Sequence, residues 1–271
     1  MSSYEHDHSI TITTHNSDDD LMARIAENYN TFKIKKIRNG SQKSWEKFYT
    51  RNKDKFFKDR NWFEKEFYEL DLSNEQVTLL EVGCGVGNLI IPLLQRHKNL
   101  YIIGCDFSKS ALLILKDNLA KKNLSHRTII YDADITKDNL QNYQIFDTRK
   151  ADYITLIFAL SAIDPISHLH VLQNFYQVLK NGGKILFRDY AVSDHAMLRF
   201  KKLNQINANF YYRQDGTLSY FFSIDYLRQI FESVGFITEE CQYIKKEINN
   251  IKENIKNIPR QFIQAKFMKP I

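Results

Sequence analysis

The stretch LLEVGCGVGN, residues 79–88, decides the fold class of this chain. It joins an apolar run, typical of a buried strand, to Gly83, Gly85 and Gly87, and a helix is expected to begin near Asn88. Glycine permits a tight turn and lets a ligand approach the backbone where a β-carbon would block it. The stretch therefore predicts a strand, a ligand-binding turn and a helix in succession.

The spacing of these glycines separates the candidate ligands. Dinucleotide sites usually show GxGxxG, whereas GxGxG preceded by an acid, here Glu81, resembles the first motif of class I methyltransferases. A glycine triplet alone is also compatible with a simple tight turn between a strand and a helix.

Short apolar runs alternate with amphipathic segments after residue 76, as in a parallel sheet covered by helices. The predicted strands are Val77–Val82, Leu100–Cys105, Arg127–Tyr131, Tyr153–Ala159 and Lys184–Arg188. A helix through Leu179 is expected to stop at Asn181-Gly182-Gly183, and another, 225–234, at Gly235. Segments 236–244 and 261–267 are expected to pair antiparallel. We predict an α/β, doubly wound, Rossmann-like sheet, mostly parallel with an antiparallel final strand.

Two acids follow the next predicted strands. Asp106 stands about twenty residues after the glycine loop, where a carboxylate accepts the hydroxyls of a ribose, and Asp134 follows the third strand. In class I methyltransferases an acid at the second place receives the adenine amino group, with Ile135 expected against the ring. Either acid alone is equally compatible with a helix cap or a solvated loop. Together they mark the edge at which open α/β sheets bind ligands.

Charge is distributed unevenly. The chain of 271 residues has a formal charge of +6, but residues 1–20 hold five acids and no Lys or Arg, so the remainder carries +11. A body this basic favours a polyanionic partner, although a merely soluble basic protein has the same composition.

Three regions are expected. Residues 1–20 form a polar, acidic, disordered tail, 21–75 a helical extension rich in basic and aromatic residues, and 76–271 the methyltransferase domain. In the extension, Trp45 and Tyr49 share one helical face and are expected to close over a cofactor or to dock the extension.

The sequence lacks the patterns of several other protein classes. Cys84, Cys105 and Cys241 show no metal-binding or disulfide spacing, so no metal is expected. No signal peptide or apolar run of membrane-spanning length is evident, so we expect a soluble protein of the cytoplasm, with the nucleus as a second compartment.

The possible identity of the atom that accepts the methyl group can be narrowed by excluding two kinds of acceptor. Methylation of an exocyclic amine generally goes with an Asn or Asp-Pro-Pro-aromatic loop, which Asp164-Pro165-Ile166 does not match. Methylation of carbon 5 needs a cysteine nucleophile, and no cysteine here has the expected context. An atom with a free lone pair remains.

Several longer motifs resemble the tRNA N3-methylcytidine methyltransferases of the methyltransferase-like group. They are FFKDRNW (56–62), LEVGCGVGN (80–88), LIFALSAI (156–163), LFRDY (186–190), DHAMLRF (194–200) and RQDGT (213–217). The resemblance covers about residues 22–271. It implies S-adenosylmethionine as cofactor and cytidine 32 of the tRNA anticodon loop as substrate. The motifs DHAM and RQDGT are most similar to those of the branch that acts on serine tRNAs together with seryl-tRNA synthetase.

Candidate site residues follow from the motifs and the resemblance. Asp189 is the candidate catalytic carboxylate, because a fixed negative charge beside cytosine stabilises the positive charge that methylation places on the ring, and its alternative is a salt bridge with Arg188 or Arg213. Tyr190 and Phe158 are expected to sandwich the flipped base or to pack in the core. We expect cofactor contacts from Trp45, Tyr49, Gly83, Gly85, Asp106, Phe107, Asp134, Ile135 and Ile157. We expect substrate contacts from Phe56, Lys58, Arg60, Phe158, Arg199, Arg213 and Arg260.

Two other functions remain open at this point. One keeps the methyltransferase class but takes a protein or small-molecule substrate, against which the basic aromatic extension argues. The other is a catalytically silent methyltransferase fold that binds RNA or a synthetase, against which the intact glycine loop argues.

Overall fold

The structure is a computed structural model that describes residues 31–68, 76–250 and 255–271. The predicted acidic tail, 1–20, lies outside the described residues. The chain divides into two compact units, 1–39 and 40–271, which are described separately. In the first unit, residues 31–39 are helical. None of the described helices is long and apolar enough to cross a membrane.

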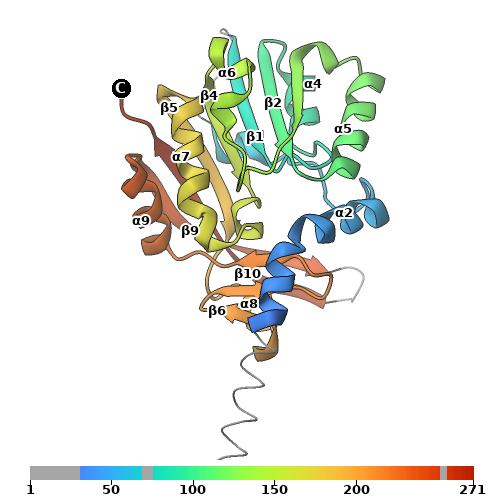
Figure 1. Cartoon of the computed structure of the whole chain (residues 1–271), viewed down its shortest axis with the longest axis vertical. Coiled ribbons are helices and arrows are strands. Elements are labelled where there is room, and N and C mark those ends of the chain that lie inside the picture. The colour runs from blue at the N-terminus through green and yellow to red at the C-terminus, as the bar shows by residue number, and fades with distance from the viewer. Residues whose placement is uncertain (1–30, 69–75, 251–254) are drawn as a thin grey trace, which may run out of the picture. The chain divides into compact units, whose positions relative to one another are not determined.

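The second unit contains a sheet that in the described residues has seven strands, in the order β3-β2-β1-β4-β5-β10-β9 (Figure 1). The strands are β1 Val77–Val82, β2 Leu100–Asp106, β3 Thr128–Asp132, β4 Ala151–Ile157, β5 Leu179–Tyr190, β9 Ile237–Asn250 and β10 Ile255–Met268. The first five are parallel, and β10 runs antiparallel to both β5 and β9. The predicted doubly wound class is confirmed, including the closing antiparallel pair.

Burial explains why these runs form strands. All six residues of β1 are buried, as expected for a central parallel strand with both faces covered. Packed against the sheet are α4 Ile90–Arg96 and α5 Lys109–Lys121 near β2, and α7 His168–Val178 and α9 Ile224–Val234 near β5 and β9 (Figure 1). Leu79, Leu93 and Leu115 meet in the core between them.

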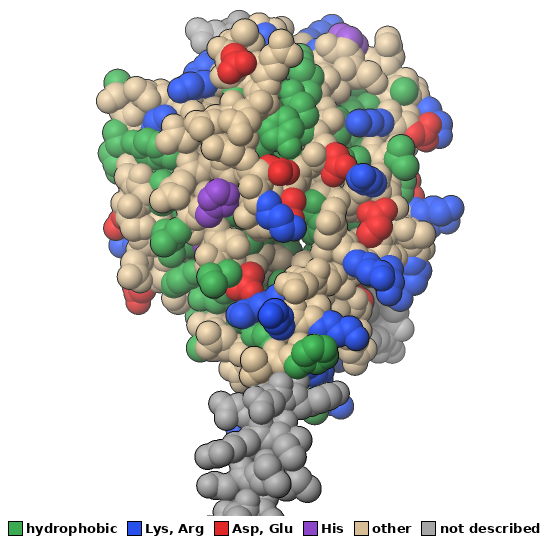
Figure 2. Space-filling model, in the orientation of Figure 1, with side chains coloured by type: hydrophobic (Ala, Val, Ile, Leu, Met, Phe, Trp, Pro, Cys, Tyr) green, Lys and Arg blue, Asp and Glu red, His purple; other side chains and the backbone are tan. Residues whose placement is uncertain are grey.

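Further elements belong to this unit. They are α2 Ser41–Asn52, α3 Phe63–Glu66, α6 Ile145–Thr148, α8 His195–Leu198, the 3₁₀ turn η3 Leu160–Ala162, and a small sheet of β6 Gln205–Asn207, β7 Phe210–Tyr212 and β8 Leu218–Tyr220. Helix α2 belongs to the predicted extension, and in Figure 2 Lys and Arg side chains gather over it.

One predicted boundary is wrong. Helix α7 ends at Val178, and β5 already begins at Leu179, before the glycines that were expected to stop the helix. Gly182 does adopt the left-handed conformation, with φ +73°, but its N–H bonds to the carbonyl of Lys269 in the C-terminal segment. The pair of glycines therefore serves a bend within the strand and not a helix cap.

Candidate active site

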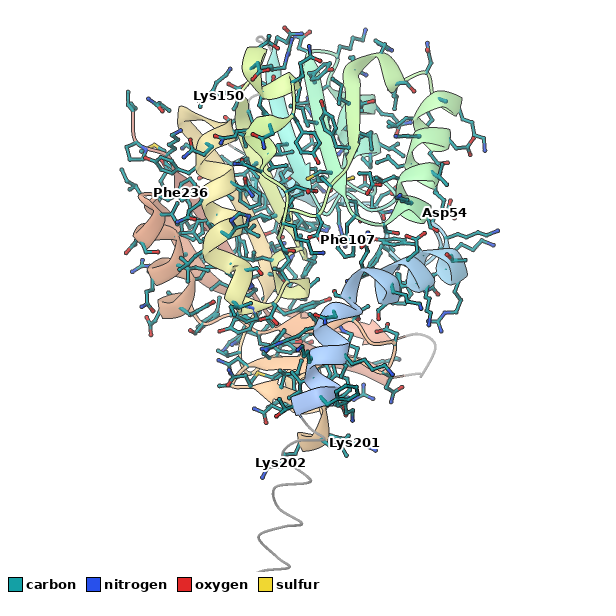
Figure 3. The ribbon with its side chains drawn as sticks, in the orientation of Figure 1. Asp54, Phe107, Lys150, Lys201, Lys202 and Phe236 are labelled. Carbon is teal, nitrogen blue, oxygen red and sulfur yellow. The ribbon has the colours of Figure 1, made fainter. Side chains whose placement is uncertain are left out.

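A pocket opens at the carboxyl ends of β1 and β4, where the strand order reverses direction and open α/β sheets bind their ligands. The space among its lining residues is about 930 Å³, including the open solvent at its mouth. Phe107 lies beside α2 at the edge of this region (Figure 3). The lining residues come from α2, the α2–α3 connection, the glycine loop and the segments after β2, β3 and β4.

The glycine loop is fixed by hydrogen bonds to the end of β2. The N–H groups of Gly83 and Cys84 both donate to the carbonyl of Cys105. Gly85 has φ +52° and donates its N–H to Oδ2 of Asp106 at 2.9 Å, while Ser108 donates its N–H to Oδ1 at 2.8 Å. Burial raises the pKa of Asp106 to about 6, and the backbone hydrogen bonds partly offset that rise. Asp106 is thus held rigidly at the floor of the pocket.

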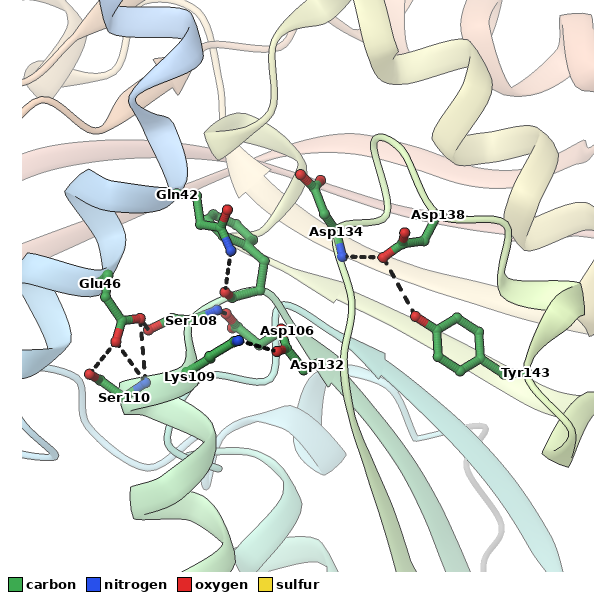
Figure 4. Close-up of polar contacts among 11 residues, drawn as sticks. Gln42, Glu46, Asp106, Ser108, Lys109, Ser110, Asp132, Asp134, Asp138 and Tyr143 are labelled. Atoms are coloured by element: carbon green, nitrogen blue, oxygen red, sulfur yellow. Dashed lines mark hydrogen bonds and ion pairs between the residues drawn. The ribbon is translucent and has the colours of Figure 1, made fainter.

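Helix α2 is joined to this floor by Glu46 (Figure 4). Its carboxylate accepts hydrogen bonds from the hydroxyl of Ser108 at 2.8 Å, from the N–H of Ser110 at 3.0 Å and from the hydroxyl of Ser110. These donors include free N–H groups of the first turn of α5, where a negative charge is stabilised by the helix dipole. The contacts set the position from which Trp45 and Tyr49 enter the pocket.

Asp134 lies on the opposite side of the pocket, in a turn after β3. Its Oδ1 accepts from the N–H and the hydroxyl of Thr136, and its Oδ2 pairs with Lys137 at 2.6 Å. These contacts hold the pKa of Asp134 below its usual value despite partial burial, which acts in the opposite direction. The lowered pKa favours the ionised carboxylate, whose oxygens accept hydrogen bonds from an amino group.

A buried amide on α7 holds the loop that follows Asp134. Asn174, which is 4% exposed, accepts the N–H of Leu140 at 3.1 Å and donates to the carbonyl of Asp138 at 2.8 Å. Asp138 in turn accepts the N–H of Asp134 at 2.7 Å (Figure 4). Asn174 therefore acts on the pocket wall through Asp138.

The other end of the pocket combines a cation with aromatic rings. The guanidinium of Arg60 lies 5.2 Å from the ring centre of Phe158 and 5.8 Å from that of Phe57. Beside it, Glu81 is buried, and its Oε2 has no hydrogen-bond partner among the described residues. Burial raises the pKa of Glu81 to about 8, partly countered by Arg60. A planar ring fits the aromatic walls, and an ammonium group would satisfy the carboxylate.

Phe158 has a strained backbone, with φ +56°. A bulky residue rarely adopts this conformation, and such strain is found at functional sites. Its N–H donates to the carbonyl of Arg188 at 2.8 Å, and Arg188 is held by an ion pair with Glu66 and by stacking on Trp62 at 4.4 Å. This network fixes the aromatic end of the pocket from behind.

The predicted cofactor residues come together. All of them line this one pocket: Trp45, Tyr49, Gly83, Gly85, Asp106, Phe107, Asp134, Ile135 and Ile157. They extend along the sequence from Trp45 to Ile157, a separation of 112 residues, so the sheet edge, and not local structure alone, assembles them. Contact of each with a cofactor stays a prediction.

Asp189, the predicted catalytic carboxylate, lies outside the pocket lining, and its contact with a bound base stays a prediction. Asp189 is 0% exposed and does not line the pocket. Its Oδ2 accepts the N–H of Ser161 at 2.9 Å and its Oδ1 that of Tyr190 at 2.8 Å. The salt bridge considered with Arg188 is also absent from the described residues, because Arg188 pairs with Glu66. The carboxylate instead holds η3, whose Ala162 lines the pocket.

The two rings expected to sandwich a base lie against each other in this structure, and their contact with a base stays a prediction. The ring centres of Phe158 and Tyr190 are 5.1 Å apart, whereas a base between two rings needs about twice the ~3.4 Å stacking distance. The two rings therefore pack on each other and, with Phe262 at 5.6 Å from Phe158, form one wall. Phe158 faces the pocket, and Tyr190 lies behind it.

The predicted substrate residues divide into three groups. Arg60 and Phe158 line the pocket. Arg260 makes a bidentate ion pair with the buried Asp194, at 2.9 Å and 3.0 Å, and Arg213 donates to the carbonyl of Leu218 and the hydroxyl of Ser219. These two arginines therefore have internal partners in this structure, and their contact with the substrate stays a prediction. Exposed and outside the pocket are Phe56, Lys58 and Arg199.

Sequence reasoning missed two positioning residues, Glu46 and Asn174. The sequence contains only a weak indication of the role of Glu46. A carboxylate can accept hydrogen bonds from the free N–H groups at the start of a helix, but the sequence does not identify which helix. Asn174 carries a different one, because a polar side chain on the apolar stripe of a helix needs buried hydrogen-bond partners.

Comparison with known proteins agrees with this geometry. Residues 13–240 match the model of a methyltransferase domain. The chain is 42% identical over 243 residues to the human tRNA N(3)-cytidine methyltransferase METTL6, which covers 88% of this chain and 84% of the human protein. The chain belongs to the tRNA N(3)-cytidine methyltransferase family.

The chain is also similar to a second member of this family and to a solved structure. It is 38% identical over 199 residues to the tRNA(Thr) (cytosine(32)-N(3))-methyltransferase of Saccharomyces cerevisiae, covering 71% of this chain and 31% of the yeast protein. A solved SAM-dependent methyltransferase from Anabaena variabilis, 17% identical, superposes with a TM-score of 0.61 over 84% of this chain and 94% of that one. The solved structure supports the fold alone.

Proposed function

We propose that this family member transfers a methyl group from S-adenosylmethionine to N3 of a cytidine in tRNA. The observation that carries the proposal is the 42% identity to a tRNA N(3)-cytidine methyltransferase along 84% of that relative. The completeness of the pocket supports activity and argues against a silent scaffold, because glycine loop, Asp106 and Asp134 are all in place.

The residues suggest how the reaction is supported. S-adenosylmethionine supplies an electrophilic methyl group on a sulfonium, and cytosine N3 has a free lone pair at neutral pH, so no strong general base is required. Asp106, Asp134 and the Trp45–Tyr49 face hold the cofactor between the sheet and α2. The cytosine stacks on Phe158 beside Arg60, whose guanidinium is a donor for the base oxygen. N3 is engaged in a paired base, so the cytidine enters unpaired or flipped.

Asp189 acts in this proposal as a positioning residue. It holds the N–H groups of Ser161 and Tyr190, and so keeps η3 and the aromatic wall in place. Unlike Asp189, the carboxyl group of Glu81 and the guanidinium of Arg60 line the pocket directly.

The finer substrate assignment is also proposed. The position is cytidine 32 of the anticodon loop, which the name of the yeast relative contains, and the tRNA is a serine tRNA recognised together with seryl-tRNA synthetase. The motifs DHAM (194–197) and RQDGT (213–217) resemble those of the branch that acts on serine tRNAs, which supports this assignment. The expected compartment is the cytoplasm, with the nucleus second.

Nucleoside mass spectrometry tests the function. Purified protein is incubated with S-adenosylmethionine and unmodified serine or threonine tRNA, with and without seryl-tRNA synthetase, and 3-methylcytidine is quantified. We expect the product with serine tRNA and none after replacing cytidine 32 by uridine. Methylation of proteins or small molecules in place of tRNA would refute the proposal.

A further inference from the structure

Helix α2 carries a row of cations on the face that points away from the pocket. Lys43, Lys47 and Arg51 follow one another at intervals of four residues, so each step advances about 6 Å along one side of the helix. All three are exposed, whereas Phe48 and Tyr49 on the other side are buried. The helix therefore presents two different faces, one toward the pocket and one toward solvent.

This row has no internal counter-charge. No side-chain hydrogen bond or ion pair joins Lys43, Lys47 or Arg51 to any part of the chain that the structure describes. Like charges four residues apart on one face of a helix repel and destabilise it. The acid on this helix, Glu46, is occupied by Ser108 and Ser110 and so does not pair with the row. An external anion is the partner that would relieve the repulsion.

The row borders a groove between α2 and the start of α5. The groove is lined by Gln42, Lys43, Glu46, Lys47, Thr50, Arg51, Phe107 and Lys109. Phe107 also lines the active-site pocket, and its carbonyl accepts a hydrogen bond from the amide of Gln42 at 3.0 Å. The groove thus leads to the mouth of the pocket, and in Figure 2 basic side chains gather over this region.

We infer that the α2 row, defined as Lys43, Lys47 and Arg51, is a track for consecutive phosphates of the RNA strand whose target nucleotide enters the pocket. The inference rests on the proposed function and assigns one surface to the substrate backbone. A regular row of cations beside a groove suits the regular charges of a single strand better than the scattered acids of a protein surface. Because the same helix inserts Trp45 and Tyr49 into the pocket, RNA bound to one face stabilises the other face against the cofactor.

The test compares two triple variants with the same loss of charge. The track variant is Lys43→Gln/Lys47→Gln/Arg51→Gln. The control is Lys98→Gln/Lys116→Gln/Lys122→Gln, three exposed lysines outside the groove. Binding of serine tRNA to the full chain is measured by fluorescence anisotropy at several salt concentrations, and S-adenosylmethionine binding by calorimetry reports whether the pocket is intact.

We expect the track variant to lose on the order of tenfold or more in tRNA affinity at low salt. Its plot of log affinity against log salt should be shallower by about 2, since each single-strand phosphate contact contributes about 0.7. The control variant should keep the wild-type slope, and both should bind the cofactor normally. A track variant with wild-type slope, or an equal loss in both variants, would overturn the track while leaving the function standing. Wild-type protein that neither binds nor methylates tRNA would instead refute the proposed function.

Discussion

The backbone N–H of Gly85 donates a hydrogen bond to the buried carboxylate of Asp106 at 2.9 Å. The loop after β1 is therefore tied to the end of β2, and the two motifs that mark the cofactor site form one unit. Tyr49 from α2 lies directly over this unit, because a β-carbon added to Gly85 would be 2.5 Å from its hydroxyl oxygen.

Gly85→Ala should weaken cofactor binding by at least tenfold. The new β-carbon would collide with Tyr49, and φ +52° is unfavourable for alanine. Calorimetric titration with S-adenosylmethionine measures the effect. The double variant Gly85→Ala/Tyr49→Phe removes the colliding oxygen and should recover part of the affinity. Wild-type affinity in the single variant would show that the loop is not in contact with the cofactor.

Glu46→Ala should also reduce cofactor affinity, by about threefold to thirtyfold, although this side chain need not touch the cofactor. The substitution frees α2 from Ser108 and Ser110 and leaves N–H groups of α5 without an acceptor, at about 1 kcal/mol for a lost cap. Glu247→Ala removes the same charge from an exposed position on β9 and serves as the control. Equal affinities in the two variants would rule out the proposed role of Glu46.

Asn174→Leu should raise the KM for S-adenosylmethionine with a smaller effect on kcat. Leucine fills the same space but leaves the N–H of Leu140 and the carbonyl of Asp138 unsatisfied, at about 1–3 kcal/mol each. Steady-state kinetics with saturating tRNA separates the two constants. Gln173→Leu, on the exposed side of the same helix, is the matched control. A lowered kcat with an unchanged KM would contradict a role at the cofactor wall.

The free energy of unfolding of the protein without cofactor should fall as pH rises toward 8. Burial raises the pKa of Glu81 to about 8, above the usual value near 4.3, so folding favours the protonated form. That stabilisation is complete below about pH 4 and is lost as pH rises through 8. Relative to Glu81→Gln, which stays neutral, the wild-type protein should lose on the order of a few kcal/mol between about pH 5 and 8. Urea denaturation at four pH values would expose the error if both proteins gave parallel profiles.

Asp189→Asn should retain at least tenfold more methyl-transfer activity than Asp189→Ala. Asparagine keeps an acceptor for the N–H of Ser161, whereas alanine leaves that N–H and the N–H of Tyr190 unsatisfied. The melting temperature should follow the same order. If both variants were equally inactive while Asp189→Asn stayed as stable as wild type, the negative charge itself would be required, and the positioning role would be wrong.

The cofactor half of the site could be read from the sequence because its signals are local. A glycine loop after an apolar run, and acids after the next two runs, require only that parallel strands end at one edge. The pocket confirms that Gly85, Asp106 and Asp134 converge. Trp45 and Tyr49 were also found, since two aromatic residues four apart share a helical face.

The catalytic and substrate half depended on tertiary structure. Whether Asp189 is open or buried depends on β10 and η3, whose pairing no local pattern specifies. Arg260 is paired because folding brings Asp194, which is 66 residues away in sequence, next to its guanidinium. The distance between the rings of Phe158 and Tyr190 depends on the positive φ angle of Phe158.

The sequence by itself determined the succession of the main strands and helices along the chain, the edge of the sheet at which a ligand is expected to bind, and the excess of positive charge. Only the tertiary structure decided which polar side chains face the pocket and which hold its walls. The physical reason is that hydrophobic periodicity and turn chemistry act over a few residues, whereas burial and hydrogen-bond pairing of a polar side chain depend on partners that folding brings from anywhere in the chain.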